Sequence, residues 1–401
     1  MIPDVEVAVV GGGPGGSATA TLLAEAGHDV ALFDRASFPR HKACSEYVNP
    51  AGARILERLG VDAEVAALGA HRMEAMLVHA PGGERFLSDF DGVEPGRAAV
   101  GLSRYRLDHL LLQRAADAGA KVYEQTPVRE VLVETGAVTG VEVRQNGSRQ
   151  KVRARLVVGA DGHRSAVSRA LGMDASSPFL KRTGLVAHYR NVRGLDRWGE
   201  MHVGYGGYGG LAPLEDGLTN VTYVANTATV ADRPESVEAF FETGLRSLPE
   251  VAWKLDGAER VGSIRGVGPM AHRAKRTAGD GWLLVGDAAY FLDPFTGEGI
   301  YAALRAAELA APVASAALRA GPVTAASLDP YRAARRRVFT AKGQFCWIVQ
   351  GFIHQPRMMD YVTTRLGQRR ELGLTLAGVL GNLHPASRAL SPLFLARLLR
   401  P

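Results

Sequence analysis

Residues 5–35, VEVAVVGGGPGGSATATLLAEAGHDVALFDR, decide the fold. An apolar run from Val5 to Val10 leads into the glycine-rich stretch GGGPGG at 11–16, and a segment rich in Ala and Leu follows as far as the turn at Gly27. A second apolar run then ends in an acidic residue. Strand, turn, helix and second strand form a complete βαβ unit, which predicts a Rossmann-like α/β domain.

The glycines of this turn each have a physical role in binding a dinucleotide. Gly11 allows the tight turn, Gly13 lets a pyrophosphate approach the backbone, and Gly16 lets the helix pack against the strand. The free N–H groups at the helix start face the phosphate charge. Asp34 stands 23 positions after Gly11, where it can accept hydrogen bonds from a ribose. The unit predicts a dinucleotide but does not separate NAD from FAD.

A distant stretch favours FAD. Residues 281–287, GWLLVGD, read as a buried strand ending in an acid, and a helix of small residues is expected over 299–311. A carboxylate beside a helix N-terminus suits a ribityl chain that carries an isoalloxazine ring. NAD has neither group, so we expect FAD to be the cofactor.

Three segments resemble the fingerprints of FAD-dependent oxidoreductases with the p-hydroxybenzoate hydroxylase fold. They are GGGPGG at 11–16, ADGHRSAVSR at 160–169 and GDAAYFLDPFTGEGI at 286–300. That superfamily includes aromatic hydroxylases, geranylgeranyl reductases and flavin-dependent halogenases. The resemblance runs to about residue 340. It implies a Rossmann-like FAD-binding domain interleaved with a mixed or antiparallel β-sheet substrate domain, followed by a C-terminal helical segment.

The implied domains are discontinuous. The FAD-binding domain is expected to comprise 1–75, 100–180 and 265–340, the substrate sheet 76–99 and 181–264, and the C-terminal helices 341–401. Alternating apolar and polar residues support strands within 73–81, 182–192 and 203–226, with a turn at Glu215 to Gly217 and an amphipathic helix over 235–248.

The resemblance also implies the residues of the cofactor site. Asp287 would hold the ribityl hydroxyls, and the turn from Pro294 to Ile300 would present backbone N–H groups to the flavin pyrimidine edge. Asp287 also needs a partner on physical grounds, because an acid that ends so apolar a strand is costly to desolvate. The full expected set is Gly11, Gly13, Pro14, Gly15, Gly16, Asp34, Arg35, Arg40, Lys42, Arg104, Val128, Asp161, Gly162, Gly286, Asp287, Pro294, Gly297, Gly299 and Ile300.

Candidate catalytic residues come from two regions. The stretch FPRHKACSEYVNP at 38–50 resembles the Lys-x-Cys-Gly region of geranylgeranyl reductases and halogenases, with Ser45 in place of the family glycine. The glycine-rich stretch around 205–208 predicts a roomy pocket wall with phenolic hydroxyl groups. The candidates are Cys44, Glu46, Tyr47, His188, Tyr205 and Tyr208. Ordinary packing or internal hydrogen bonding is the simpler alternative for Cys44, the two sheet tyrosines and His188.

The features disagree about the reaction. DPFTGEGIYAAL at 293–304 resembles the reductase form of the third fingerprint, whereas YGGYGGLAPLEDG at 205–217 lacks the tryptophans expected of geranylgeranyl reductases and tryptophan halogenases. The lead hypothesis is a monooxygenase that hydroxylates an aromatic or polyketide-like compound with NADPH or NADH and O2. The alternative is a reductase that saturates C=C bonds of a prenyl or quinone lipid. A halogenase and a non-catalytic flavoprotein rank lower.

Composition sets the remaining bounds. The chain has 46% apolar and 22% charged residues, as expected for a globular cytoplasmic protein, and no apolar run long enough to span a bilayer. Its two cysteines, Cys44 and Cys346, support neither a disulfide framework nor a metal site. The net charge is +6, with no basic and aromatic groove for nucleic acid. RAARRR at 332–337 suits a solvated helix face, or contact with phosphate, a carrier protein or a membrane surface. A monomer or a homodimer fits.

Overall fold

A parallel sheet forms the core of the first part of the molecule. The computed structural model describes residues 2–175, 180–195, 197–233 and 235–400. Strand β1 (Val5–Val10) is buried everywhere except at Glu6, as expected for a strand covered on both faces. The strand order is β18 (Ala278–Gly279), β19 (Trp282–Leu284), β11 (Ser148–Gly159), β1, β2 (Val30–Phe33) and β8 (Lys121–Tyr123). Only the β18–β19 pair on this path is antiparallel.

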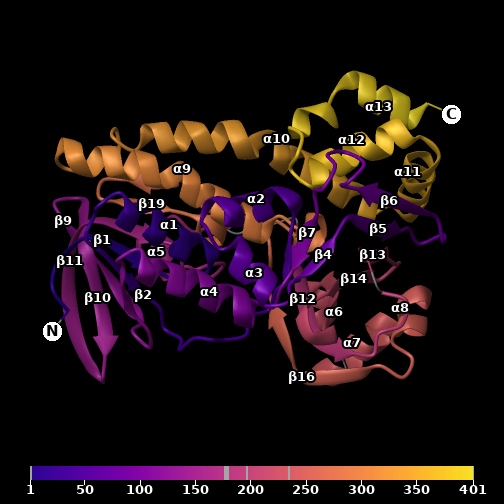
Figure 1. Ribbon diagram of the computed structural model, residues 1–401, viewed down its shortest axis with the longest axis horizontal. Coiled ribbons are helices and arrows are strands. Elements are labelled where there is room, and N and C mark those ends of the chain that lie inside the picture. Colours follow the sequence, from indigo (N-terminus) through magenta and orange to yellow (C-terminus); the bar gives the residue numbers. More distant parts are fainter. Residues whose placement is uncertain (1, 176–179, 196, 234, 401) are drawn as a thin grey trace.

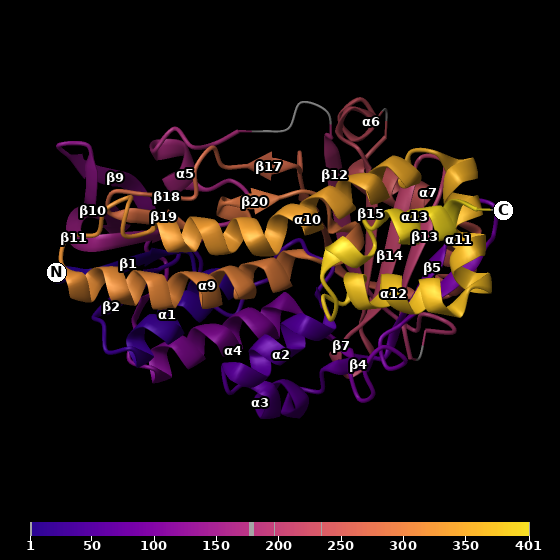
Figure 2. The ribbon, with the colours of Figure 1, turned by 90° about the horizontal axis from the view of Figure 1, so that it is seen from above.

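Helices cover one face of this sheet and a strand meander covers the other (Figure 1). Helices α1 (Pro14–Glu25), α4 (Arg104–Asp117) and α9 (Gly299–Ala320) lie on the first face, with α10 (Asp329–Ile353) beside α9 (Figure 2). Val7 and Val9 share a core with Leu23 and Ala306 on this side. Strand β10 (Ala137–Gln145) pairs antiparallel with β11 and, on its other edge, with β9 (Val128–Glu134), and short helix α5 (Ala166–Ala170) lies near them.

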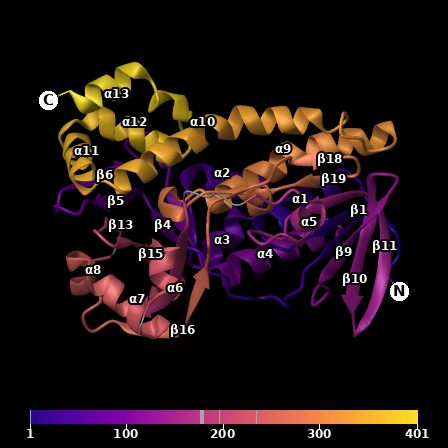
Figure 3. The same cartoon turned by 180° about the vertical axis from the view of Figure 1, so that it is seen from behind.

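A second, mostly antiparallel sheet lies beside the first part along the long axis of the molecule (Figure 3). Its order is β16 (Glu259–Val267), β12 (Arg182–Arg190), β15 (Thr219–Asn226), β14 (Gly207–Pro213), β13 (Gly199–Val203), β5 (Ala75–His79) and β6 (Arg85–Asp89). Helices α6 (Thr227–Ala231), α7 (Val237–Arg246) and α8 (Pro249–Lys254) accompany it, and α7 and α8 share a core with one face. Its other face packs against the end of α10 and against α11 (Pro356–Gln368), α12 (Arg370–Leu380) and α13 (Pro392–Leu399).

Short elements connect the two parts. A three-stranded sheet contains β3 (Tyr47–Val48), β7 (Ala99–Gly101) and β4 (His71–Met73), and helices α2 (Pro50–Arg58) and α3 (Asp62–Ala67) lie near it. Strands β17 (His272–Arg273) and β20 (Tyr290–Phe291) pair beside the third fingerprint.

The predicted fold class is confirmed: an α/β sheet domain, a mixed sheet and C-terminal helices are all present. The predicted domain bounds stay a prediction. Strand β5 already begins at Ala75 and β16 ends at Val267, so the second sheet reaches slightly beyond them. The boundary expected at 180 adjoins residues 176–179, which lie outside the described residues.

One helix differs from the sequence expectation. The helix expected over 299–311 extends to Ala320, with Pro312 inside it. Pro312 is exposed, and buried alanines stand on both sides of it, so packing maintains the helix where proline alone would end it. Among the described residues, none of the helices combines the length and apolar character needed to cross a bilayer.

Candidate functional site

A cavity lies between the parallel sheet and the second sheet, where all three fingerprints meet. We call it the main cavity. Its walls come from β12, β15, the segment after β2, and the N-termini of α1 and α9. Its lining includes Gly13, Pro14, Gly15, Lys42, Cys44, Ser45, Tyr47, Arg104, Gly162, His163, Val186, Thr222, Met270, Gly286, Asp287, Phe291, Pro294, Gly297, Glu298, Gly299 and Ile300.

The first fingerprint forms one end of this cavity. Gly11 has a φ of 105°, which favours glycine, and a Cβ on Gly16 would lie 1.8 Å from the Gly11 carbonyl oxygen. Both glycines therefore allow the backbone of the turn to pack closely, and neither lines the cavity. Gly13 does line it, and a Cβ there would come within 4 Å only of the Arg104 guanidinium. An extended anion can approach the backbone at this point.

Positive charge is concentrated at the same end. Arg104 opens α4 and is buried, with its Nε 2.5 Å from Oδ1 of Asp108. Burial opposes the charge, but the Asp108 carboxylate raises the pKa of Arg104. Lys42 lies inside the cavity, 3.0 Å from the position of a Cβ on Gly162. This pair of cations suits a pyrophosphate.

Two expected acidic residues serve the backbone and do not line the cavity. Asp34 accepts hydrogen bonds from the backbone N–H groups of Gly12 and Ala36, both at 2.7 Å. Asp161 caps the start of α5 by accepting from Ala166 at 2.5 Å, and burial raises its pKa. Its Oδ1 is buried and has no protein partner. The expected contacts of both residues with FAD stay predictions.

The third fingerprint lines the cavity close to the first: a Cβ on Gly15 would lie 3.4 Å from Ala303, and one on Gly286 would lie 3.2 Å from the same residue. Burial raises the pKa of Asp287, while the charges of Lys42 and Arg104 oppose that rise. Gly297 adopts the left-handed conformation, with a φ of 65°, directly before α9. A Cβ on it would lie 2.5 Å from the Tyr47 ring, so only glycine fits between that ring and the turn.

These residues fit FAD. An open glycine cradle and two basic side chains match a pyrophosphate, Asp287 offers a carboxylate to hydroxyl groups, and the N-terminus of α9 also lines the cavity.

The segment from Cys44 to Tyr47 is held by a buried carboxylate. Glu46 has a φ of 56°, rare for a residue with a side chain. Its Oε1 accepts from the Arg104 backbone N–H at 2.8 Å, and its Oε2 lies 2.5 Å from His188 Nε2 and 2.8 Å from Asn220 Nδ2. Glu46 and His188 are buried and are not among the residues that line the main cavity, and their expected catalytic roles stay predictions. Cys44 and Tyr47 do line the cavity.

The two sheet tyrosines also differ from expectation. Tyr205 lies in the turn between β13 and β14 and is 82% exposed, so it is not a pocket residue. Tyr208 is fully buried, donates a hydrogen bond to Asp293 at 2.6 Å and lies under the Arg182 guanidinium. Tyr205 faces solvent because it lies in the hairpin turn. Tyr208 faces the core because of its position in strand β14.

Three further cofactor candidates are not among the residues that line the main cavity. Arg35 is exposed, and Arg40 pairs with Asp108 at 2.9 Å. Val128 begins strand β9 of the meander, where its side chain packs against a separate core. The expected contacts of these three residues with FAD stay predictions.

A second, mainly apolar cavity adjoins the first, and we call it the inner cavity. The two share Ser45, Tyr47, Pro294 and Gly297. The inner cavity extends between the second sheet and the C-terminal helices, and its further lining includes Met76, Val78, Phe90, Met201, Leu211, Thr296 and Leu380.

A buried ion pair, not foreseen from the sequence, ties the C-terminal helices to the third fingerprint. Lys342 of α10 lies 2.8 Å from Oε1 of Glu298, and Asn382 donates to both carboxylate oxygens of Glu298 at 2.9 and 3.0 Å. Burial raises the pKa of Glu298, and Lys342 opposes that rise. Lys342 and Asn382 are too far from Glu298 in the sequence for a local motif to predict the contact. The sequence signal was Glu298 itself, an acidic residue between Gly297 and Gly299 of the turn.

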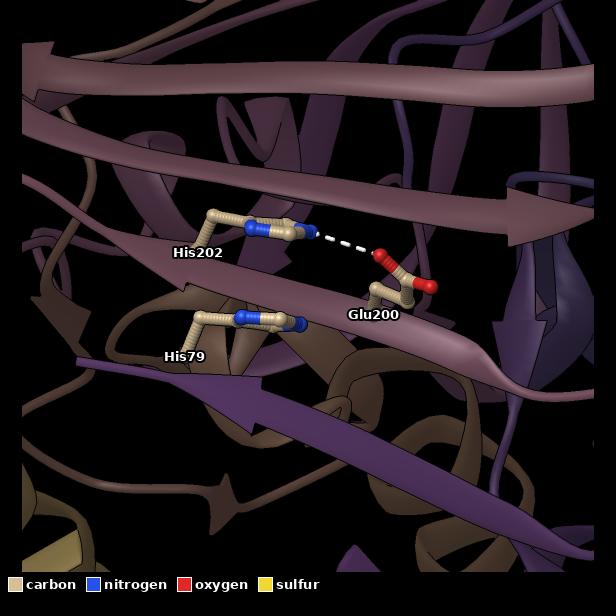
Figure 4. Close-up of side chains that lie close together, drawn as sticks. All are labelled: His79, Glu200 and His202. Carbon is tan, nitrogen blue, oxygen red and sulfur yellow. Dashed lines mark hydrogen bonds and ion pairs between the residues drawn. The ribbon is translucent and has the colours of Figure 1, made fainter. Parts of the chain in front are cut away.

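The second sheet also holds a cluster of metal-ligand residue types, although the sequence predicted no metal. His79 on β5 stacks on His202 on β13, and the His202 imidazole contacts Glu200 at 2.7 Å (Figure 4). Lys254 lies 3.1 Å from the other oxygen of Glu200. Because this ammonium already neutralises the carboxylate, we interpret the cluster as an internal polar network.

Comparison with known proteins agrees with this geometry. The family model described as FAD binding domain matches residues 4–345. Digeranylgeranylglycerophospholipid reductase 2 of Methanopyrus kandleri is 31% identical over 341 residues, which cover 82% of this chain and 81% of that protein. Menaquinone reductase of Mycolicibacterium smegmatis is 31% identical over 318 residues, or 76% of this chain and 75% of that protein.

Among solved structures, the flavin-dependent brominase Bmp2 superposes with a TM-score of 0.84 at 19% identity. The match covers 94% of this chain and 93% of that one. At this identity the likeness shows a shared fold and nothing about the reaction.

Proposed function

The chain is an FAD-dependent oxidoreductase of the FAD binding domain family, and we propose that it reduces carbon–carbon double bonds in a prenyl or quinone lipid. The two relatives support this choice, since their names record reduction of a digeranylgeranylglycerophospholipid and of menaquinone. The alternative weighed in the sequence analysis therefore replaces hydroxylation as the leading hypothesis.

The inner cavity is the observation that carries the proposal. Methionine, valine, leucine and phenylalanine side chains dominate its walls, and it opens from the part of the main cavity next to Gly297. Apolar walls stabilise a hydrocarbon chain by roughly 25 cal/mol for each Å² removed from water. A prenyl tail in this cavity would have one end beside the flavin turn.

Reduction of a C=C bond adds a hydride to one carbon and a proton to the other. Bound FAD, once reduced by a pyridine nucleotide or another electron donor, supplies the hydride. The Cys44 thiol and the Tyr47 hydroxyl line the main cavity and are the groups that we assign to deliver the proton. Burial raises the pKa of Tyr47, and the Glu298 carboxylate adds to the rise, so the phenol holds its proton at neutral pH.

Hydroxylation of a phenol has less support from the site. The hydroxyl groups expected to orient such a substrate belong to Tyr205 and Tyr208, of which one is at the surface and the other donates to Asp293. A pocket for a polar aromatic ring normally supplies hydrogen-bond partners in its wall.

An anaerobic single-turnover experiment tests the proposal. The FAD-loaded protein is reduced with dithionite, freed of excess reductant and mixed with menaquinone or with a digeranylgeranyl phospholipid. We expect the flavin to become reoxidised without oxygen, and the lipid to gain the mass of two hydrogen atoms at an alkene on mass spectrometry.

A lipid that stays unchanged without oxygen, together with an aromatic compound that gains one oxygen atom once air is admitted, would overturn the reductase in favour of the monooxygenase. Reoxidation that converts only the quinone ring to the quinol would also contradict C=C reduction. The variant Cys44→Ser/Tyr47→Phe should retain FAD and lose most of the lipid turnover.

A further inference from the structure

The positive charge of the chain is concentrated at one end. Residues 329–401 contain twelve Lys and Arg residues and three acidic residues, a net charge of +9, whereas the whole chain carries +6. Residues 1–328 therefore carry a net charge of −3. Such asymmetry is typical of a segment that meets an anionic partner.

Helix α10 presents a continuous exposed face. Its inward residues include Phe345 and Cys346, which pack in the core beneath it. The exposed residues recur every three or four positions, so they follow one side of the helix. They are Ala333, Arg337, Thr340, Gln344, Trp347 and Gly351, with Arg336 and Ile348 next to them.

Helix α13 repeats this arrangement over a shorter length. Phe394 and Leu398 are buried, whereas Leu393, Arg397 and Arg400 are exposed. Figures 1 and 2 place α10 and α13 on the same side of the molecule, above the second sheet and the α9 layer. We call the exposed residues of these two helices the cap face.

The cap face combines arginine with exposed large apolar side chains. Trp347 is 43% exposed, Leu393 62% and Leu399 49%. Tryptophan and leucine beside arginine are typical of helices that lie in the interface of a membrane. A partner recognised by charge alone would leave these apolar side chains unexplained.

The cap also borders the substrate space. Leu380, at the end of α12, lines the inner cavity, and α12 and α13 share a core with the sheet that forms its floor. A lipid that leaves a bilayer at the cap face would have only this helical layer to cross before reaching the inner cavity.

We propose that the cap face binds the surface of an anionic phospholipid bilayer. The proposed function supplies the reason for membrane binding, since the substrate would be a lipid. The charge and the exposed side chains support the membrane surface independently of that substrate. Arginines attract the anionic headgroups, while Trp347 and Leu393 enter the headgroup boundary.

Cosedimentation of the FAD-loaded protein with vesicles tests this surface. We expect binding to phosphatidylcholine vesicles that contain phosphatidylglycerol, weaker binding to phosphatidylcholine alone, and a loss on raising the salt concentration. Trp347→Ser/Leu393→Ser should reduce binding about tenfold, as should Arg336→Gln/Arg337→Gln. The matched control is Trp253→Ser on α8, which removes a tryptophan that is 55% exposed outside the cap face.

Three results would overturn the proposal: no binding to anionic vesicles at low salt, equal losses with the control variant, or losses with the arginine variant alone. The last would indicate an electrostatic surface suited to an acidic protein. Binding is measured without turnover, so its failure is separate from a failure of the reductase assay.

Discussion

At the scale of the residue, Glu46 shows how a fixed carboxylate shapes the wall of the site. The left-handed backbone at this position costs roughly 1 to 3 kcal/mol for a residue with a side chain, and persists only when its surroundings hold it. Three donors, from Arg104, His188 and Asn220, converge on its carboxylate. Glu46 therefore positions Cys44 and Tyr47, its neighbours in the cavity wall.

We predict that Glu46→Gln destabilises the protein and loosens this wall. The NH2 group of glutamine is a hydrogen-bond donor, so it would replace an accepting oxygen and leave at least one of the three buried donors unpaired. The expected cost is about 2 to 3 kcal/mol of unfolding free energy. Urea unfolding measures the loss, and the visible spectrum of bound FAD reports the changed wall. Glu84→Gln, at an exposed position, is the control. Unfolding and spectra that match wild type would show that the three hydrogen bonds do not hold the segment.

A second prediction concerns pH. Burial lowers the pKa of His79 to about 4, with His202, Arg85 and Lys254 adding to the shift and Glu200 opposing it. The unfolded chain, with a histidine pKa of about 6.5, binds this proton more readily. Stability contributed by neutral His79 is therefore present above about pH 6.5 and lost as the pH falls towards 4.

The variant His79→Phe keeps a ring against His202 and removes this titration. Its unfolding free energy should fall less than that of wild type between about pH 7 and pH 4.5. Identical slopes in the two proteins would show that His79 does not carry the dependence.

At the scale of the element, α10 serves two surfaces. Its outward side forms the cap face, and its inward side carries Lys342 to Glu298, next to the turn that opens α9. The helical cap is therefore joined to the flavin end of the main cavity by a buried charge pair. Such a pair adds little net stability when intact, but losing one partner leaves a buried charge uncompensated.

We predict that Lys342→Met lowers stability by about 3 kcal/mol or more and weakens FAD binding. Adding Glu298→Gln to that variant should recover part of the stability, because no charge is then left alone. Arg336→Gln, on the exposed side of the same helix, is the control. Denaturation measures the stability, and fluorescence titration measures the binding of FAD. A Lys342→Met variant as stable as wild type would contradict the assignment of a buried ion pair between Lys342 and Glu298.

At the scale of the whole molecule, the cofactor end could be predicted from sequence because its signals are local. The first βαβ unit and the third fingerprint each combine a strand, a turn and a helix within a few tens of residues. Gly13, Asp287 and Gly297 accordingly line the main cavity.

The substrate side could not be predicted in the same way, because it depends on long-range packing. Whether a tyrosine beside a glycine-rich turn faces a pocket depends on register, and Tyr205 and Tyr208 both face elsewhere. The inner cavity needs strands and a C-terminal helix that are far apart in the chain. No spacing in the sequence brings Phe90 and Leu380 together.

The central claim is that three distant segments enclose one FAD and that the Asp287 carboxylate helps to hold it. The most direct measurement is the FAD released on heat denaturation, for each mole of chain, after reconstitution. We expect close to one equivalent for wild type and for the exposed control Asp256→Ala, and a loss of most of it for Asp287→Ala. A wild-type protein that stays colourless, or an Asp287→Ala variant that retains a full equivalent, would contradict the account.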